Sequence, residues 1–274
     1  MNILSLEHLT HSYKESQHFD DADFYLHEGD KVGVIGINGT GKSTLLKIMA
    51  GLETPDEGQV IQASNLMIHY LPQNPEFSED DTVLQSVQNM VHHHANENEL
   101  IAAKAMLTRL GITDFEQKTR ELSGGQRKRL ALVSVLITPC DVLILDEPTN
   151  HLDSEMADWL ENKLQAFRGA LVMVTHDRYF LDSVTNKIIE LDKGKIYSYD
   201  EKYSGFLQRK AEREESARAS ERKRQSILRK EIEWISRGAR ARSTKQKAHI
   251  QRYEALKNQK APEVDEKLQL SSIS

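Results

Sequence analysis

The first 200 residues alternate short apolar runs with stretches of helical periodicity, and turn residues separate the two kinds of segment. This order is typical of strands that feed helices across a largely parallel sheet. Three apolar runs predict buried strands, namely KVGVIG at 31–36, DVLILD at 141–146 and ALVMVT at 170–175. Ligands bind beyond the carboxyl ends of parallel strands, so the residues that follow these runs are candidates for chemistry.

The pattern changes beyond residue 200. Residues 208–226 contain no large apolar side chain but are rich in Ala, Glu, Arg and Lys, which favour a helix that projects into solvent or lies between partners. Two apolar stripes then flank Gly238 and predict an antiparallel helical hairpin within residues 201–260. The first stripe is Ile227, Leu228, Ile232 and Ile235, and the second is Ile250, Tyr253 and Leu256.

Charge divides the chain at the same place. The whole sequence carries a formal charge of −6, but residues 201–260 contain 18 Lys or Arg and 8 Asp or Glu, a net charge of +10. Two parts with different partners are therefore expected. No apolar run is long enough to cross a membrane and the N-terminus lacks a signal-peptide pattern, so we expect a cytoplasmic protein. Cys140, next to an apolar run, is expected to be an inert buried thiol.

The segment GINGTGKST follows the first predicted strand and runs into the apolar stretch LLKIMAGL. It matches the phosphate-binding loop (P-loop) pattern, in which glycines let backbone N–H groups and a helix N-terminus approach phosphates. Lys42 is expected to reach the terminal phosphates, and Ser43 to hold Mg²⁺. The predicted nucleotide-binding residues of this loop are Gly36, Asn38, Gly39, Thr40, Gly41, Lys42, Ser43 and Thr44.

Two adjacent acids end the second predicted strand. Asp146 is expected to bind Mg²⁺ directly or through water, and Glu147 to orient a water or accept its proton during attack on a γ-phosphate. Such a pair on its own is equally compatible with a solvated strand end. The P-loop on another strand of the same predicted sheet favours the catalytic interpretation.

The stretch LSGGQRKRLALVSVL at 122–136 places an SGG turn before a helix with a predicted apolar stripe at 130, 132, 133, 136 and 137. With this turn between the P-loop and the acidic pair, the chain resembles the ATP-binding cassette (ABC) superfamily over residues 1–200. The resemblance implies an α/β P-loop ABC ATPase cassette, with a mixed sheet and a small helical subdomain at about 74–140. It also implies ATP and Mg²⁺ as cofactors.

The same resemblance assigns further roles. Tyr13 would stack on adenine, Gln73 would sense Mg²⁺ and the attacking water, and His176 would contact the γ-phosphate, so that the catalytic set is Glu147, His176 and Gln73. Asn150–Asp153 correspond to a loop exchanged between cassettes. The residues expected to close over the ATP of another cassette are Ser123, Gly124, Gly125 and Gln126.

One cassette cannot complete such a site alone, because the SGG turn serves a nucleotide held by another P-loop. The sequence contains one set of these motifs. We therefore expect a second cassette from a homodimer, a separate partner or a longer chain. ATP hydrolysis by these residues alone is expected to be weak.

The tip of the predicted hairpin is strongly basic, and its composition alone favours nucleic-acid binding and a solvated helix equally. After a cassette, this appendix makes the chain similar to the ABC-F family, specifically its Uup-like branch, whose linker reaches ribosome-bound tRNA. The resemblance implies an N-terminal cassette plus linker, with residues 261–274 as a flexible tail toward a second cassette. The alternatives are a nucleotide-binding subunit of a membrane transporter and a nucleic-acid binding module. The RNA-contact candidates are Arg237, Arg240, Arg242, Lys245 and Lys247.

Overall fold

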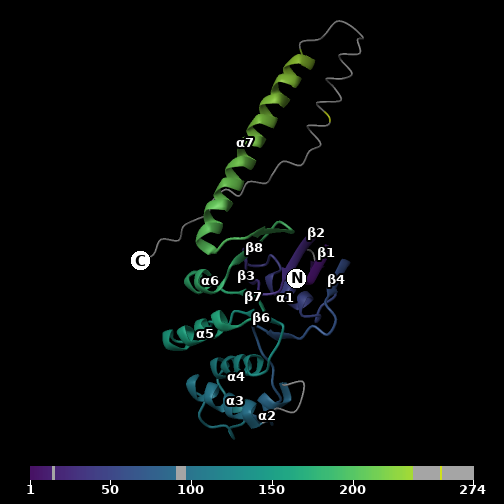
Figure 1. Cartoon of the computed structure of the whole chain (residues 1–274). Coiled ribbons are helices and arrows are strands. Elements are labelled where there is room, and N and C mark those ends of the chain that lie inside the picture. Colours follow the sequence, from purple (N-terminus) through teal and green to yellow (C-terminus); the bar gives the residue numbers. More distant parts are fainter. Residues whose placement is uncertain (14–15, 91–96, 237–253, 255–274) are drawn as a thin grey trace. The chain divides into compact units, whose positions relative to one another are not determined.

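A computed structural model describes residues 1–13, 16–90, 97–236 and 254 of the chain (Figure 1). The chain divides into two units, Met1–Phe206 and Leu207–Ser274. The first unit contains both β-sheets, and helix α7, Tyr203–Ser236, begins in the first unit and continues into the second. The assignment of a cassette to 1–200, a hairpin to 201–260 and a tail to 261–274 stays a prediction.

A six-stranded sheet in the order β5-β6-β7-β3-β8-β9 forms the centre of the first unit. Neighbouring strands are parallel except for β9, which pairs antiparallel with β8. The three predicted buried strands are confirmed as β3, β6 and β7. The bounds are β3 Lys31–Ile35, β5 Ile68–Leu71, β6 Val142–Asp146, β7 Ala170–Val174, β8 Lys187–Asp192 and β9 Lys195–Tyr199.

Both faces of this sheet are covered, which explains why its central strands are apolar without alternation. Every residue of β6 and β7 is buried. Alternate residues enter different cores: Leu143 and Leu145 pack with the helices of one layer, while Val142 and Ile144 pack with the other layer. Helix α1, Lys42–Met49, belongs to the second core, and helices α5, Ser154–Ala166, and α6, Arg178–Val184, belong to the first.

An antiparallel three-stranded sheet, in the order β2-β1-β4, completes the second core. Its strands are β1 Asn2–Tyr13, β2 Ser16–His27 and β4 Glu57–Gln62. Leu4, Leu6, Phe24 and Leu26 point into the core and are at most 1% exposed. This sheet was not predicted strand by strand, although the alternation of FDDADFYLH indicates a strand with one buried face.

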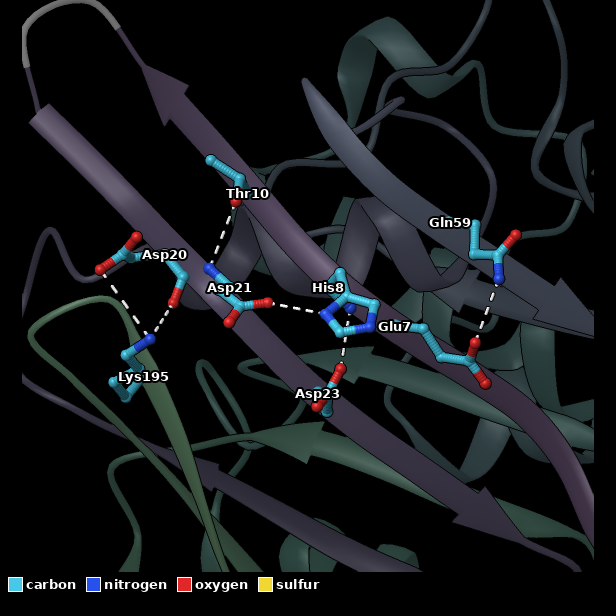
Figure 2. A network of polar contacts seen from close by, with 8 residues as sticks. All are labelled: Glu7, His8, Thr10, Asp20, Asp21, Asp23, Gln59 and Lys195. Atoms are coloured by element: carbon cyan, nitrogen blue, oxygen red, sulfur yellow. Dashed lines mark hydrogen bonds and ion pairs between the residues drawn. The ribbon is translucent and has the colours of Figure 1, made fainter.

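Polar side chains of this small sheet form a network around a distortion of β1 (Figure 2). His8 has a left-handed backbone (φ 54°), and its Nδ1 atom lies 2.8 Å from Oδ1 of Asp21, which is also left-handed (φ 50°). The backbone N–H of His8 donates to Asp23 at 2.8 Å. Lys195 of β9 contacts Asp20 of β2, so the network also ties the edge of the central sheet to the small sheet.

A helical segment lies between β5 and β6 in the sequence. It consists of helices α2 Val83–Met90, α3 Glu97–Arg109 and α4 Gly124–Leu136, with a short 3₁₀ turn at Thr119–Glu121. Both α2 and α3 contact α4. The predicted apolar residues of this helix are confirmed as core residues, because Leu130, Leu132, Val133 and Ile137 are buried and Leu136 packs against the same core. Burial also extends to Ala131, Ser134 and Val135. Packing between the sheet and the other helices surrounds this part of α4 on all sides.

Helix α7 is 34 residues long, which corresponds to about 50 Å at 1.5 Å per residue. Its start is fixed to the first unit: the N–H of Ser204 donates to Oδ1 of Asp182 at 2.8 Å, and the buried Phe206 ring meets Tyr199 edge-on at 5.1 Å. Charged pairs such as Arg224–Glu221 (2.7 Å) support the polar part. The prediction of a helix over 208–226 is confirmed, and the predicted second hairpin helix lies outside the described residues apart from Glu254, which is helical.

Within the described parts of the chain, no helix is long and apolar enough to cross a membrane.

Candidate nucleotide-binding and hydrolysis site

The predicted P-loop connects the carboxyl end of β3 to helix α1. Gly39 and Gly41 are left-handed, with φ of 86° and 91°. A Cβ atom added to Gly39 would meet nothing within 4 Å, so the backbone conformation is what requires glycine there. Asn38 and Gly39 are exposed, and the Thr40 hydroxyl donates to the Ile37 carbonyl at 2.9 Å, which holds the turn together.

The N-terminus of α1 is suited to an anion. Its N-cap is Gly41, and no side chain caps the N–H groups of its first turn. In contrast, Ser123, Asp153 and Asp177 cap helices α4, α5 and α6 with side-chain oxygens. Uncapped N–H groups at the positive end of a helix dipole bind phosphate well. This terminus therefore fits the phosphates of a nucleotide.

Lys42 is positioned inside the loop. Its Nζ atom donates to the carbonyl oxygens of Gly36 at 2.8 Å and Ile37 at 3.0 Å, which holds the ammonium group beside the glycine turn. Partial burial lowers the pKa of Lys42, and the nearby carboxylates of Glu147 and Asp146 oppose that shift. The loop and the acidic pair thus form one electrostatic site. Thr44 is half-buried in the first turn of α1.

Asp146 and Ser43 fit a Mg²⁺ ion. Asp146 ends β6 and is only 3% exposed. Burial raises the pKa of its carboxyl group, while a hydrogen bond from Ser43 and the charge of Lys42 lower it. Among the described residues, Oδ2 of Asp146 has no hydrogen-bond partner. A buried carboxylate oxygen without a partner beside a serine hydroxyl is an oxygen donor set that suits Mg²⁺, which also takes ligands from phosphate and water.

Glu147 and His176 meet at the ends of β6 and β7. Nε2 of His176 lies 3.4 Å from Oε1 of Glu147, and the backbone N–H of His176 donates to Oε2 at 3.4 Å. Glu147 is 6% exposed and left-handed (φ 54°), whereas the His176 side chain is 72% exposed. Burial raises the pKa of Glu147, and His176 opposes this. Backbone strain and a raised carboxyl pKa are both typical of a catalytic base.

The other predicted contacts of this site lie on neighbouring strands. Gln73 is exposed and follows β5, which is the strand next to β6. For Tyr13 the structure describes only the backbone, as the last residue of β1. The P-loop, Asp146, Glu147, His176 and Gln73 thus all follow the carboxyl ends of four parallel strands, as expected for a ligand site in an α/β sheet.

The SGG turn, Ser123–Gly125, forms the start of α4. Ser123 and Gln126 make a reciprocal capping box: the N–H of Gln126 donates to Ser123 Oγ at 3.2 Å, and the N–H of Ser123 donates to Gln126 Oε1 at 2.9 Å. A Cβ atom added to Gly124 would meet nothing within 4 Å. Among the described residues, no hydrogen bond or ion pair joins this turn to the P-loop, so the two predicted halves of the site are separate within one cassette.

Several supporting residues were not predicted. Asp177 accepts the N–H groups of Tyr179 and Phe180, both at 3.0 Å, and so fixes the turn that carries His176. The hydroxyls of Thr149 and Thr175 lie 2.8 Å apart and join the loop after Glu147 to the end of β7. An Asp directly before a helical run is a capping signal that indicates the first of these contacts. The second depends on tertiary structure.

The five RNA-contact candidates, Arg237, Arg240, Arg242, Lys245 and Lys247, lie outside the described residues. Among the described residues, no cluster of three or more His, Cys, Asp or Glu side chains could hold a metal ion. A Mg²⁺ ion at Asp146 and Ser43 would therefore need ligands from a nucleotide and from water.

The chain is similar to known ABC proteins in sequence and in fold. Residues 19–150 and 189–271 match two family models that are both described as ABC transporter. The uncharacterized ABC transporter ATP-binding protein YfmR of Bacillus subtilis (strain 168) is 43% identical over 300 aligned positions, which cover 96% of this chain and 48% of that protein. The energy-dependent translational throttle protein EttA of Escherichia coli (strain K12) is 36% identical, over 83% of this chain and 48% of EttA.

The fold also matches solved cassettes. A dimeric ATP-binding cassette in a post-hydrolysis state with ADP and Pi bound superimposes with a TM-score of 0.62 at 24% identity, covering 72% of this chain and 98% of that one. This likeness shows the fold. The chain spans about half the length of the curated relatives it matches.

Proposed function

This chain carries an ATP-binding cassette of the ABC type, which binds ATP with Mg²⁺, and from that premise we propose that it hydrolyses ATP to control its residence on ribosomes. The observation that carries the hydrolytic part is the buried, strained Glu147 beside His176, next to the magnesium-suited pair Asp146 and Ser43. Together these groups would supply the base, the metal ligands and the phosphate contact for hydrolysis of a γ-phosphate.

Each residue would have a defined task in this reaction. The N–H groups at the start of α1 and the ammonium group of Lys42 would bind the phosphates, while Ser43 and Asp146 would hold Mg²⁺, which neutralises charge on the phosphate oxygens. Glu147 would accept a proton from the attacking water, because burial raises its pKa and favours the proton-bound form. His176, exposed toward solvent, would contact the γ-phosphate, with Gln73 near the Mg²⁺ ion and the water.

We propose that a second cassette supplies the SGG turn that closes each site. One cassette has two surfaces that suit phosphate: the open space in front of Gly124 and the uncapped start of α1. Among the described residues, no hydrogen bond joins these two surfaces. The related solved cassette is dimeric, which is consistent with this arrangement. Turnover by the chain alone would then rise with protein concentration.

The translational part of the proposal rests on two supports. EttA, which is 36% identical, is named as an energy-dependent translational throttle protein. The segment that follows α7 contains Arg237, Arg240, Arg242, Lys245 and Lys247 and no acid between 237 and 247. Such a cluster suits contact with RNA phosphates, so ribosome-bound tRNA is the proposed partner and the cytoplasm the proposed location. Membership of the Uup-like branch of ABC-F is part of this proposal.

Binding of tRNA tests this part directly. Replacing Arg237, Arg240 and Arg242 together with Ala should weaken binding and lower the slope of log affinity against log salt by about one for each lost phosphate contact. The matched control replaces Arg222, Lys223 and Arg229, which are exposed on α7, and removes the same charge. Equal losses in both variants would show non-specific attraction and contradict an RNA contact at the tip.

A transporter subunit is the second candidate, because the matching family models are described as ABC transporter. That function requires a membrane protein partner. Stable co-purification with a membrane protein, together with unchanged tRNA binding in the tip variant, would favour the transporter role over the ribosomal one.

A further inference from the structure

The two glycines of the SGG turn have different surroundings. A Cβ atom added to Gly124 would meet nothing within 4 Å, which leaves that side of the turn open for a ligand. A Cβ atom added to Gly125 would lie 3.3 Å from Cβ, 3.7 Å from Cγ and 3.9 Å from Nδ1 of His151. Gly125 is helical and needs no positive φ, so a larger residue there is restricted by His151, whose exposed side chain would have to shift by a few tenths of an ångström.

His151 belongs to the loop that follows the candidate base. This loop begins at Glu147 (φ 54°) and reaches His151 (φ 68°), so two non-glycine residues in left-handed conformations lie within five positions. Left-handed residues other than glycine are costly and persist where the surroundings hold them. Two hydrogen bonds hold the loop: the Asn150 N–H donates to the Glu147 carbonyl at 3.3 Å, and the hydroxyls of Thr149 and Thr175 lie 2.8 Å apart. The His151 side chain lies beside Gly125, with its Cβ atom 3.3 Å from the place that a Cβ atom on residue 125 would take.

The loop therefore connects three functional segments of one cassette. Glu147 lies at its start, His176 follows Thr175 at the end of β7, and the SGG turn lies against His151. We propose that His151 is a positioning residue, which fixes the SGG turn relative to the hydrolytic base of the same cassette. This inference rests on the proposed hydrolysis of ATP between two cassettes.

Changes at residue 151 are expected to affect catalysis but not nucleotide binding. Among the described residues, no hydrogen bond or ion pair joins the P-loop or α1 to His151, so changes at 151 should leave ATP affinity intact. Misplacement of the SGG turn or of Glu147 should instead lower turnover, because small displacements of reacting groups are costly. The expected signature is a lower kcat with an unchanged KM.

Two substitutions at residue 151 distinguish positioning from a general structural role. Asn reproduces Cβ, Cγ and a polar atom in the place of Nδ1, and it tolerates the left-handed region well. Gly removes the whole side chain and also relieves the backbone strain. For the full chain, His151→Asn should keep kcat within about twofold, while His151→Gly should lower kcat roughly tenfold or more with KM unchanged and no loss of thermal stability.

Thermal unfolding tests whether the residues at 125 and 151 interact, without any measurement of activity. Gly125→Ala would place a methyl group 3.3 Å from Cβ of His151, so the shift in melting temperature that it causes should be more favourable, by roughly 2–4 °C or more, in the His151→Gly chain than in the wild-type chain. Gly124→Ala is the matched control, because His151→Gly should not change its effect. The proposal is overturned if the effects at 125 and 151 are additive, or if His151→Gly lowers stability and leaves kcat unchanged. Absence of turnover in the wild-type chain would instead contradict the proposed function, and the thermal cycle would still decide the contact.

Discussion

Nε2 of His176 lies 3.4 Å from Oε1 of Glu147, while the backbone N–H of the same histidine donates to the second carboxylate oxygen at 3.4 Å. The two residues lie at the ends of the adjacent parallel strands β6 and β7, whose last paired residues are Asp146 and Val174. Glu147 directly follows Asp146, and Thr175 separates His176 from Val174. One side chain is almost fully buried and the other is exposed. The carboxylate of Glu147 is thus buried in the protein, and the exposed side chain of His176 contacts it from the solvent side.

Glu147→Gln should stop hydrolysis and preserve ATP binding, because the amide cannot accept the proton of the attacking water. We expect turnover to fall by about 10²- to 10⁴-fold, the usual contribution of a general base. Single-turnover phosphate release and equilibrium ATP binding measure the two properties separately. The control is Glu155→Gln, since Glu155 is exposed and pairs with Arg109 on the surface. Retained turnover in Glu147→Gln would remove Glu147 from the reaction.

Lys42→Ala should weaken ATP binding itself. The ammonium group is held within the P-loop by two carbonyl oxygens, so its loss removes a charge-assisted contact to phosphate, worth roughly a 10- to 100-fold change in Kd. Lys47→Ala is the matched control, because Lys47 is exposed in the last turn of the same helix. Equal affinity of the two variants would contradict the assignment of this loop.

Asp146→Asn should abolish the effect of Mg²⁺ on ATP affinity while making the fold more stable. Burial raises the pKa of Asp146, so the folded state binds its proton more tightly than the unfolded state. The stability that this tighter proton binding contributes is complete below the pKa of the carboxyl group in the unfolded state. It is lost as the pH rises through the higher pKa of the folded state. At pH 7 the charged group therefore destabilises the fold, and Asn should raise the melting temperature by a few degrees.

The advantage of Asn at position 146 should shrink as the pH is lowered, because the wild-type carboxyl group becomes neutral in the folded state. Melting curves of both proteins between pH 5 and pH 8, without nucleotide or metal, measure this difference. A melting temperature lowered at pH 7 by Asp146→Asn would contradict the account of this carboxyl group.

Cys140 should react slowly in the native protein. Burial, together with the charge of Asp141, raises the pKa of its thiol to about 12, so the thiolate is scarce at pH 8. It is the only cysteine in the chain, so labelling with a maleimide reports on this site alone. We expect native labelling to be about 100-fold slower or more than labelling in urea. Comparable rates would show that the thiol is accessible and ionised.

Much of the cassette could be predicted because its central strands and motifs are local in sequence. The apolar runs that became β3, β6 and β7 are buried on both faces, and each ends at a residue of the candidate site. The small sheet was missed because two adjacent acids, Asp20 and Asp21, break the alternation of β2 where Asp21 is left-handed (φ 50°).

Contacts between distant segments could not be predicted from the sequence. His151 and Gly125 belong to a loop and a helix start, and nothing in either stretch indicates that they touch. The burial of every residue from Leu130 to Val135 in α4 likewise depends on how α2 and α3 pack against this helix, which periodicity does not report. The second helix of the predicted hairpin and the role of its basic tip stay predictions.

Sedimentation with 70S ribosomes tests directly whether ATP controls the residence of this protein on the ribosome. The Glu147→Gln chain should co-sediment more strongly in ATP than in ADP, because ATP would persist in its site, and Lys42→Ala should abolish the difference between the nucleotides. Replacement of Arg237, Arg240 and Arg242 with Ala should weaken co-sedimentation in both nucleotides. Binding that is indifferent to nucleotide and to the basic tip would contradict the central claim that ATP controls residence on the ribosome.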